Sequence, residues 1–226
     1  MIGKFWQDNR ILKSLALLSL SSVVLFLAGI LFYGDSLFWF LNWNLFLAWL
    51  PLLFVWQLVE TLKHHPWLSW RGILYSLLWL SFLPNSFYIA TDFVHMRYAT
   101  STTSLFYVVI ILSFTLNGFI LGYMSIYLFH KQLQKRVSAL ATRSIIATVL
   151  LLCSFAIYLG RYLRWNTWDV IVNPAGLLFD VSDRLINPAA HGQTFRITLL
   201  FFILLATVYT VIWQFVQSIR ESDAKK

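Results

Sequence analysis

Residues 104–129 read SLFYVVIILSFTLNGFILGYMSIYLF and contain no charged side chain. A helix needs about 20 mainly apolar residues to cross the hydrocarbon core of a bilayer, which is roughly 30 Å thick. This stretch is therefore predicted to be a transmembrane helix. Gly118 and Gly122 lie four residues apart near its middle, a spacing that lets the backbone of a neighbouring helix approach closely. The stretch thus indicates a helix that packs tightly inside a membrane.

Comparable apolar runs recur along the whole chain. Hydrophobic residues make up 59% of the sequence and charged residues 12%, whereas soluble domains have about 25% charged residues. We therefore predict an all-α, polytopic transmembrane helical bundle of about six spans, with a long outer connection between spans five and six. The predicted spans of this single integral-membrane domain, residues 1–226, are residues 14–33, 37–59, 72–91, 104–129, 144–163 and 197–216.

Two further segments need interpretation. Lys4, Arg10 and Lys13 precede the first apolar run, as in a signal peptide. The run is longer than a signal-peptide core and is followed by further spans, so we interpret it as a retained first helix. Residues 165–196 form the long connection, and its aromatic and apolar content predicts a short interfacial or re-entrant helix.

Positive charge is distributed unevenly between the two sides of the predicted bundle. Six spans place both termini on one side, where twelve of the 17 Lys and Arg residues fall. These twelve are Lys4, Arg10, Lys13, Lys63, Arg71, Lys131, Lys135, Arg136, Arg143, Arg220, Lys225 and Lys226. The other five are Arg97, Arg161, Arg164, Arg184 and Arg196. The positive-inside rule predicts that both termini are cytoplasmic. The net charge of +8 is then explained by Lys and Arg residues that lie against the anionic lipids of the bilayer, so no nucleic-acid partner is predicted.

A polar stretch closes the third predicted span on the outer side. Residues 83–97 read LPNSFYIATDFVHMR. If the stretch is helical, Asn85, Tyr88, Asp92 and His95 recur at about the helical period and share one face. Such a row of hydrogen-bonding and titratable groups in an apolar chain requires polar partners.

A second polar stretch closes the fifth span on the same side. Residues 161–169 read RYLRWNTWD, in which Arg161 and Arg164 lie three residues apart. An arginine at membrane depth is costly unless it is paired, so Asp92 is predicted to pair with Arg161 or Arg164. Such a pair would lock two helices together. Trp165 and Trp168 are typical of an aromatic belt at the level of the lipid headgroups. The same groups also suit a binding cluster made of Asn85, Tyr88, Arg161, Arg164, Trp165, Asn166 and Trp168.

A catalytic interpretation uses the same stretches. It assigns His95 as general acid or base, with Asp92 orienting it and Asp169 assisting. The spacing of Asp92 and His95 also permits two metal ligands, with Asp169, Asp183 or His191 as additional ones. The sequence has neither an HExxH motif nor a histidine cluster, so we predict no metal and no cofactor.

Both polar stretches resemble the family of predicted bacterial membrane proteins called domain of unknown function 1361. The resemblance runs through an LPN-x-x-Y-x-x-TD-x-x-H segment and a GR-x-x-RWN-x-WD segment. The matching residues are Pro84, Asn85, Tyr88, Thr91, Asp92, His95, Gly160, Arg161, Arg164, Trp165, Asn166, Trp168 and Asp169. The resemblance implies a bacterial multi-pass membrane protein, hence one of the plasma (inner) membrane, and implies no activity.

Three classes of function stay open at the level of the sequence. The leading hypothesis is recognition of an envelope lipid headgroup or of a membrane-protein partner by the outward-facing polar and aromatic cluster. The second is a membrane enzyme, a hydrolase or transferase, acting on a lipid-linked or glycosidic envelope substrate. The third is a small-solute transporter or transporter subunit, in which two spans kinked at Pro51 and Pro84 would line a path together with Asn117.

Overall fold

The computed structural model describes residues 9–34 and 36–224, which form an all-α structure. Within these ranges, six helical segments are long and apolar enough to cross a membrane. They are Arg10–Tyr33, Trp39–Thr61, Trp70–Tyr98, Ser104–Leu133, Ala139–Leu163 and Gly192–Asp223. The predicted polytopic membrane fold with six spans is therefore confirmed. Lys4, Lys225 and Lys226, which enter the predicted topology, lie outside the described residues.

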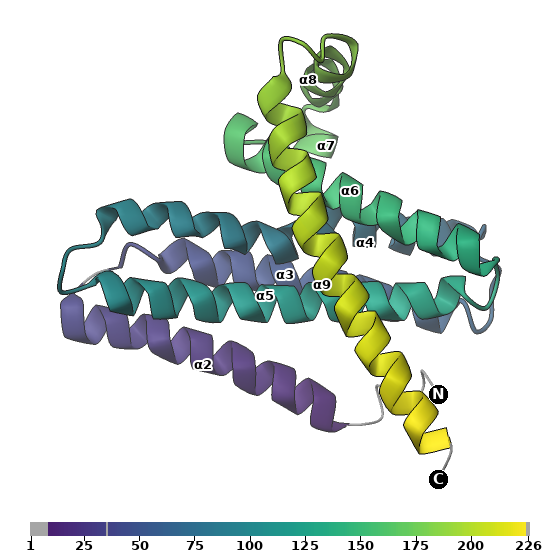
Figure 1. The fold of residues 1–226 in the computed structure, drawn as a ribbon, viewed down its shortest axis with the longest axis horizontal. Coiled ribbons are helices and arrows are strands. Elements are labelled where there is room, and N and C mark those ends of the chain that lie inside the picture. The colour runs from purple at the N-terminus through teal and green to yellow at the C-terminus, as the bar shows by residue number, and fades with distance from the viewer. Residues whose placement is uncertain (1–8, 35, 225–226) are drawn as a thin grey trace. The chain divides into compact units, whose positions relative to one another are not determined.

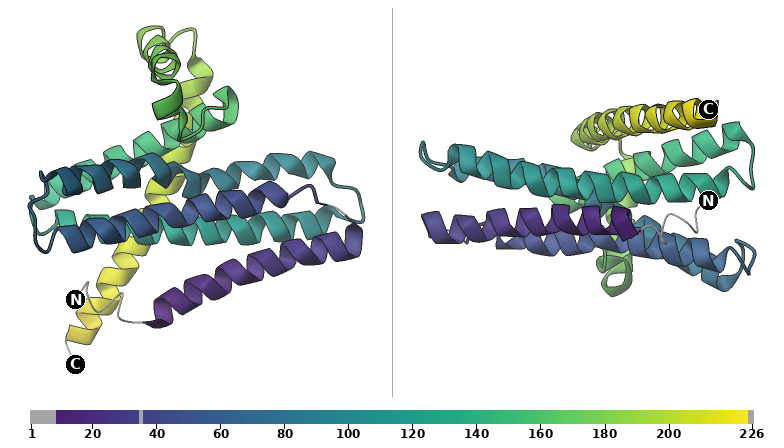
Figure 2. Two further views of the ribbon diagram at one scale, coloured as in Figure 1. Left: turned by 180° about the vertical axis from the view of Figure 1, so that it is seen from behind. Right: turned by 90° about the horizontal axis from the view of Figure 1, so that it is seen from below.

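The chain divides into two compact units, and the boundary lies within α5 between Phe129 and His130. The first unit contains helices that run beside one another in Figures 1 and 2. These are α2 (Asn9–Tyr33), α3 (Trp39–Thr61), α4 (Trp70–Tyr88), the 3-10 helix η1 (Ile89–Tyr98) and most of α5 (Ser104–Leu133). The prediction of one domain over residues 1–226 concerns both units together and stays a prediction.

The second unit follows from the end of α5. It contains two long helices, α6 (Ala139–Leu163) and α9 (Gly192–Ala224), which pack against each other. The connection between them carries the short α7 (Asp169–Val172) and α8 (Pro174–Ile186). The expected helix in the long connection is therefore present, and a second, shorter helix precedes it. Asn173 caps α8 by accepting a hydrogen bond from the Gly176 N–H at 3.2 Å.

Close backbone packing at two glycines holds α5 against α4. A Cβ atom on Gly118 would overlap the carbonyl oxygen of Ser86, and one on Gly122 would lie 2.7 Å from the Phe87 ring. The predicted role of this glycine pair in helix packing is therefore confirmed. About two turns further along α5, Trp79 stacks on Phe129 with ring centroids 3.9 Å apart.

A polar contact joins α2 to α5 at the depth of Asn117. The Asn117 amide is fully buried, and its Nδ2 donates to the Ser19 hydroxyl at 3.2 Å. The Trp49 indole of α3 donates to the same hydroxyl at 3.0 Å. Interhelical bonds of this kind satisfy polar groups that would otherwise lie in hydrocarbon. Asn117 thus acts as a contact between helices.

The end of the third span is wound more tightly than an α-helix. The expected helix continues to Tyr98, but from Ile89 onward it is a 3-10 helix. Runs of this length are uncommon for 3-10 geometry. Thr91 supports the tighter winding, because its hydroxyl donates to the Tyr88 carbonyl three residues earlier at 2.7 Å. Residues three apart are eclipsed here, so Asp92 and His95 share a face.

Candidate functional site

The polar stretch of the first unit centres on a buried carboxylate. Asp92 is 1% exposed, so its carboxylate is enclosed by protein within a membrane-embedded chain. The Asn44 amide of α3 donates to its Oδ2 atom at 3.1 Å. Asn44 was not predicted to belong to the cluster, because the contact joins residues 48 positions apart. Asn44 and Asp92 therefore form a polar contact between spans two and three.

His95 lies beside Asp92 but is held mainly by the backbone. Its Nδ1 atom is 3.0 Å from the Asp92 carbonyl oxygen and 3.9 Å from the carboxylate oxygen Oδ1. A carbonyl oxygen can accept but not donate, so Nδ1 carries the proton in this bond. The imidazole also packs against Phe40, with ring centroids 4.9 Å apart. This geometry positions His95 on the helix without a short bond to the Asp92 side chain.

Asn85 and Tyr88 precede this pair in α4 and are half-buried. The Asn85 amide donates to the Phe82 carbonyl at 3.0 Å, one turn back. Pro84 removes a backbone donor from this region, and the neighbouring Ser86 hydroxyl donates to the Ala48 carbonyl of α3 at 3.2 Å. Asn85 and Ser86 thus make hydrogen bonds beside the proline, one within α4 and one to α3.

The second polar stretch begins where α6 ends. Arg164 has φ 61° and ψ 27°, a left-handed conformation that is rare outside glycine. Its N–H bonds to the Leu159 carbonyl, and so does the Trp165 N–H at 3.3 Å. This cap turns the chain sharply, leaving the Arg164 side chain exposed and Arg161 half-buried in the last turn. The predicted pairing of Asp92 with Arg161 or Arg164 stays a prediction.

Asp169 and Asn166 form a local hydrogen-bonded turn at the start of α7. The Asp169 carboxylate accepts from the Asn166 backbone N–H at 2.6 Å and from its side-chain amide at 3.3 Å. Trp168, between them, is 45% exposed. The proposed catalytic role of Asp169 stays a prediction, while its observed bonds stabilise the turn before α7.

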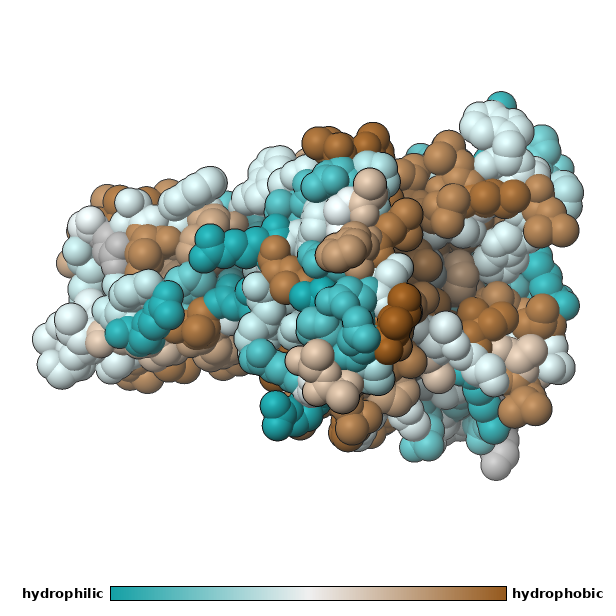
Figure 3. Space-filling model, turned by 90° about the horizontal axis from the view of Figure 1, so that it is seen from above, coloured by the Kyte–Doolittle hydropathy of each residue, from teal (hydrophilic) through white to brown (hydrophobic). Residues whose placement is uncertain are grey.

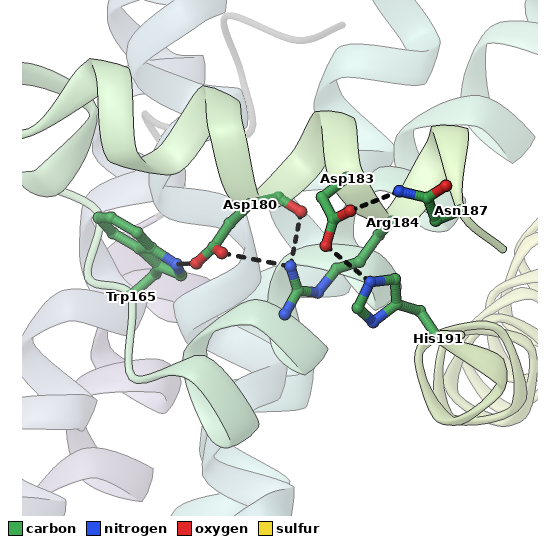
Figure 4. A network of polar contacts seen from close by, with 6 residues as sticks. All are labelled: Trp165, Asp180, Asp183, Arg184, Asn187 and His191. Atoms are coloured by element: carbon green, nitrogen blue, oxygen red, sulfur yellow. Dashed lines mark hydrogen bonds and ion pairs between the residues drawn. The ribbon is translucent and has the colours of Figure 1, made fainter.

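A network of side chains on α8 holds Trp165 in place (Figure 4). The indole of Trp165 donates to Asp180 Oδ2 at 2.7 Å. Arg184 donates from Nη1 to the Asp180 backbone carbonyl at 2.6 Å and to its Oδ1 at 3.3 Å. Arg184 is buried at 7% exposure, so a charge-assisted bond to Asp180 offsets part of its desolvation.

The same network reaches the start of α9 through Asp183. The Asn187 amide donates to Asp183 Oδ1, and His191 Nε2 lies 2.7 Å from Oδ2. Figure 4 shows Trp165 and His191 at opposite ends of the network. The bond from Asn187 and then that from His191 lower the pKa of the Asp183 carboxyl below its usual value. Together these contacts join both ends of the α6–α9 connection.

The helices of this connection leave large apolar side chains exposed. Ile171 of α7 is 85% exposed. On α8, Leu178 and Phe179 are 65% and 73% exposed, and Leu185 and Ile186 are 63% and 75% exposed. These four residues share one helical face, opposite Asp180 and Arg184, and Asp183 lies at the border of this face. Figure 3 looks onto α8 and shows hydrophilic side chains beside strongly hydrophobic ones.

In the second unit, titratable side chains form pairs, such as Asp183 with His191. Throughout residues 9–34 and 36–224, no three His, Cys, Asp or Glu residues lie close enough to hold a metal ion together. Asp183 and His191, which the sequence analysis considered as additional ligands to an Asp92–His95 site, bind each other instead.

A comparison with family models matches residues 43–208 to the model described as "Protein of unknown function (DUF1361)". The chain belongs to this family. The matched range contains both polar stretches, Asn44 and the α8 network. Searches of curated proteins and of solved structures found no match. Membership of DUF1361 thus agrees with the resemblance stated from the sequence and supplies no activity.

Besides Asn44, the contacts within the α8 network were not predicted from the sequence. Their signal was the spacing of Asp180 and Arg184, and of Asp183 and Asn187, both four residues apart. Such pairs become meaningful once the segment is known to be a helix. A helix was predicted within residues 165–196 without defined bounds, so these residues could not be placed on one helical face.

Acidification is expected to loosen the bond between α8 and the start of α9. Because the folded-state pKa of Asp183 lies below the ordinary value of about 3.9, its stabilising effect is present above that pH and disappears as pH falls through the lowered value. The thermal midpoint of wild type should therefore decrease more between pH 6 and pH 3 than that of Asp183→Asn. Asp223→Asn, which changes an exposed carboxylate near the end of α9, should behave like wild type. An equal decrease in Asp183→Asn and wild type would contradict this role.

Proposed function

We propose that the chain is a bacterial plasma-membrane protein, with both termini in the cytoplasm, whose outer face recognises the anionic headgroup of an envelope lipid. The observation that carries this proposal is the amphipathic α8. It lies outside the six membrane-spanning segments, yet it exposes Leu178, Phe179, Leu185 and Ile186 on one face. Helices with this distribution lie in the membrane interface, with their apolar face among the acyl chains.

The residues around α8 supply groups that suit a headgroup. Arg164 is exposed at the end of α6, and a guanidinium binds phosphate oxygens through two parallel hydrogen bonds. Trp165 is oriented by Asp180, so its ring has a fixed direction. Trp168 is 45% exposed, as expected for an aromatic side chain at the headgroup level. The left-handed conformation of Arg164 also supports a positioned side chain, because such strain is concentrated at functional sites.

The geometry favours recognition over catalysis or transport. His95 Nδ1 bonds to the Asp92 backbone carbonyl at 3.0 Å and lies 3.9 Å from the Asp92 carboxylate, so this nitrogen is bonded to the backbone and not to the carboxylate that the catalytic interpretation uses. Asn117 is enclosed by contacts between helices and has fully buried neighbours at Phe114 and Leu121. This close packing argues against a polar path through Asn117 for a solute.

The proposal is tested by removing the Arg164 guanidinium while keeping the backbone turn. Arg164→Gly suits the left-handed conformation, so we expect the protein to fold with unchanged or slightly increased stability. Retention of phosphatidylglycerol by the detergent-purified protein, measured by native mass spectrometry, should decrease about tenfold, which corresponds to about 1.4 kcal/mol.

Arg196→Ala is the matched control, because Arg196 is an exposed arginine on the same predicted side. This variant should retain phosphatidylglycerol as wild type does. Equal retention by Arg164→Gly and wild type would overturn the proposal. If a co-purifying membrane protein is lost from Arg164→Gly while lipid retention is unchanged, the cluster recognises a protein partner instead.

A further inference from the structure

A cavity of about 690 Å³ lies in the second unit, away from the α7–α8 connection. It is bounded by the end of α5, the first half of α6 and the second half of α9. A volume of this size suits a small-molecule ligand or part of a lipid. Its residues belong to none of the clusters described above, so the cavity is a separate feature of the fold.

The walls of the cavity change from apolar to polar along the two long helices. Ile146 and Leu150 of α6 form the apolar part together with Ala206 of α9. Toward the beginning of α6 and the end of α9, the lining residues become Arg143 and Glu221. Along each helix, the lining therefore changes from apolar at the middle of the membrane span to polar at its end. A ligand that fills this space is expected to be amphiphilic, with its polar group at the helix ends.

The charged lining residues are one cation and one anion. Arg143 and Glu221 are both exposed at the polar end. Within the described part of the chain, neither side chain forms an ion pair. The helix dipoles add to these two side-chain charges, because the beginning of α6, near Arg143, is partially positive and the end of α9, near Glu221, is partially negative. These charges complement a group that carries both a phosphate and an ammonium.

The cavity also contains a hydrogen-bond donor without an acceptor. The Nε2 atom of Gln217 is buried and makes no hydrogen bond within residues 9–34 and 36–224. Buried amide donors are normally satisfied, and because Gln217 lines the cavity, a rotation of its side chain would let this amide donate to a bound oxygen atom. Beside it, His130 stacks on Trp213 with centroids 3.7 Å apart and bonds to the Tyr209 hydroxyl at 2.8 Å. This ordered aromatic wall gives the site a fixed shape.

We propose that this cavity binds an aminophospholipid of the bilayer, such as phosphatidylethanolamine. The phosphate lies toward Arg143, the ammonium toward Glu221, and Gln217 donates to a phosphate or ester oxygen. The acyl chains leave along the apolar part formed by Ile146 and Leu150. This site is independent of the outer cluster and uses a zwitterionic lipid instead of an anionic one.

The test compares two zwitterionic lipids on the full-length protein in detergent. Phosphatidylethanolamine and phosphatidylcholine carry the same charges, but the quaternary ammonium of phosphatidylcholine has no N–H group to donate to Glu221. Native mass spectrometry with equal amounts of both lipids should show at least fivefold higher retention of phosphatidylethanolamine by wild type. Equal retention of the two lipids would overturn the proposal.

Two substitutions then locate the lipid. Glu221→Gln should remove the preference for phosphatidylethanolamine, and Arg143→Gln should reduce retention of both lipids about tenfold. Lys135→Gln and Asp223→Asn change exposed charges near the same helix ends outside the cavity lining, and both should behave like wild type. A preserved preference in Glu221→Gln, or wild-type retention in Arg143→Gln, would overturn the proposal. Arg164→Gly should leave this preference unchanged, so failure at one site is distinguishable from failure at the other.

Discussion

Gly118→Val is expected to lower the free energy of unfolding by about 3 kcal/mol, near the upper end of the range for overpacked cores. A Cβ atom at this position would overlap the Ser86 carbonyl oxygen and lie 3.0 Å from the Ile89 side chain. The obstructing atom is part of the backbone of α4, which the hydroxyl of Ser86 also ties to Ala48 of α3. The helices must therefore separate, because no side chain can rotate out of the way.

The measurement is a denaturant titration of the purified protein in mixed micelles, followed by tryptophan fluorescence. Leu116→Val introduces the same residue on the exposed face of α5, where the side chain is 50% exposed, and should change the midpoint little. The midpoint of Gly118→Ala should lie between those of wild type and Gly118→Val, because alanine adds only the Cβ atom, which already overlaps the Ser86 carbonyl oxygen. If Gly118→Val and Leu116→Val shift the midpoint equally, the glycine contact does not stabilise the fold.

The features that could be predicted from the sequence are those that depend on local composition. Apolar runs of about 20 residues are sufficient to locate six spans, because the bilayer thickness fixes the length. The Gly118–Gly122 spacing predicted close packing, since small residues at i and i+4 open one face of a helix. The helix within residues 165–196 could be anticipated from apolar content, but its cap at Asn173 was not recognised.

The features that were missed depend on contacts between distant segments or on backbone geometry. Asn44 and Asp92 are 48 residues apart, and nothing in the sequence selects Asn44 over Asn42 as the partner. Asn42 instead donates to the carbonyl of Trp39 in its own helix. The 3-10 winding of η1 was also not predicted, because its residue pattern fits an α-helix equally well. The cavity lined by Arg143 and Glu221 arises from the packing of α6 with α9, which sequence periodicity does not define.

The buried carboxylate of Asp92 gives the second large expected effect. Removing one partner of a buried polar pair leaves the other unsatisfied, which costs more than the pair itself contributes. Asp92→Ala is therefore expected to lower the free energy of unfolding by about 3 kcal/mol. The side chain is 2% exposed, so water does not replace the lost acceptor.

A double-mutant cycle between Asn44 and Asp92 separates their contact from other effects of each substitution. We expect Asn44→Ala and Asp92→Ala to be non-additive, with a coupling energy of about 1.5 kcal/mol, as for a hydrogen bond to a charged group. Asn42→Ala is the matched control, because Asn42 lies two residues away on α3 and bonds within its own helix. Its effect should add to that of Asp92→Ala within about 0.5 kcal/mol. A coupling energy near zero for Asn44, or one as large for Asn42, would show that the 3.1 Å contact does not tie α3 to η1.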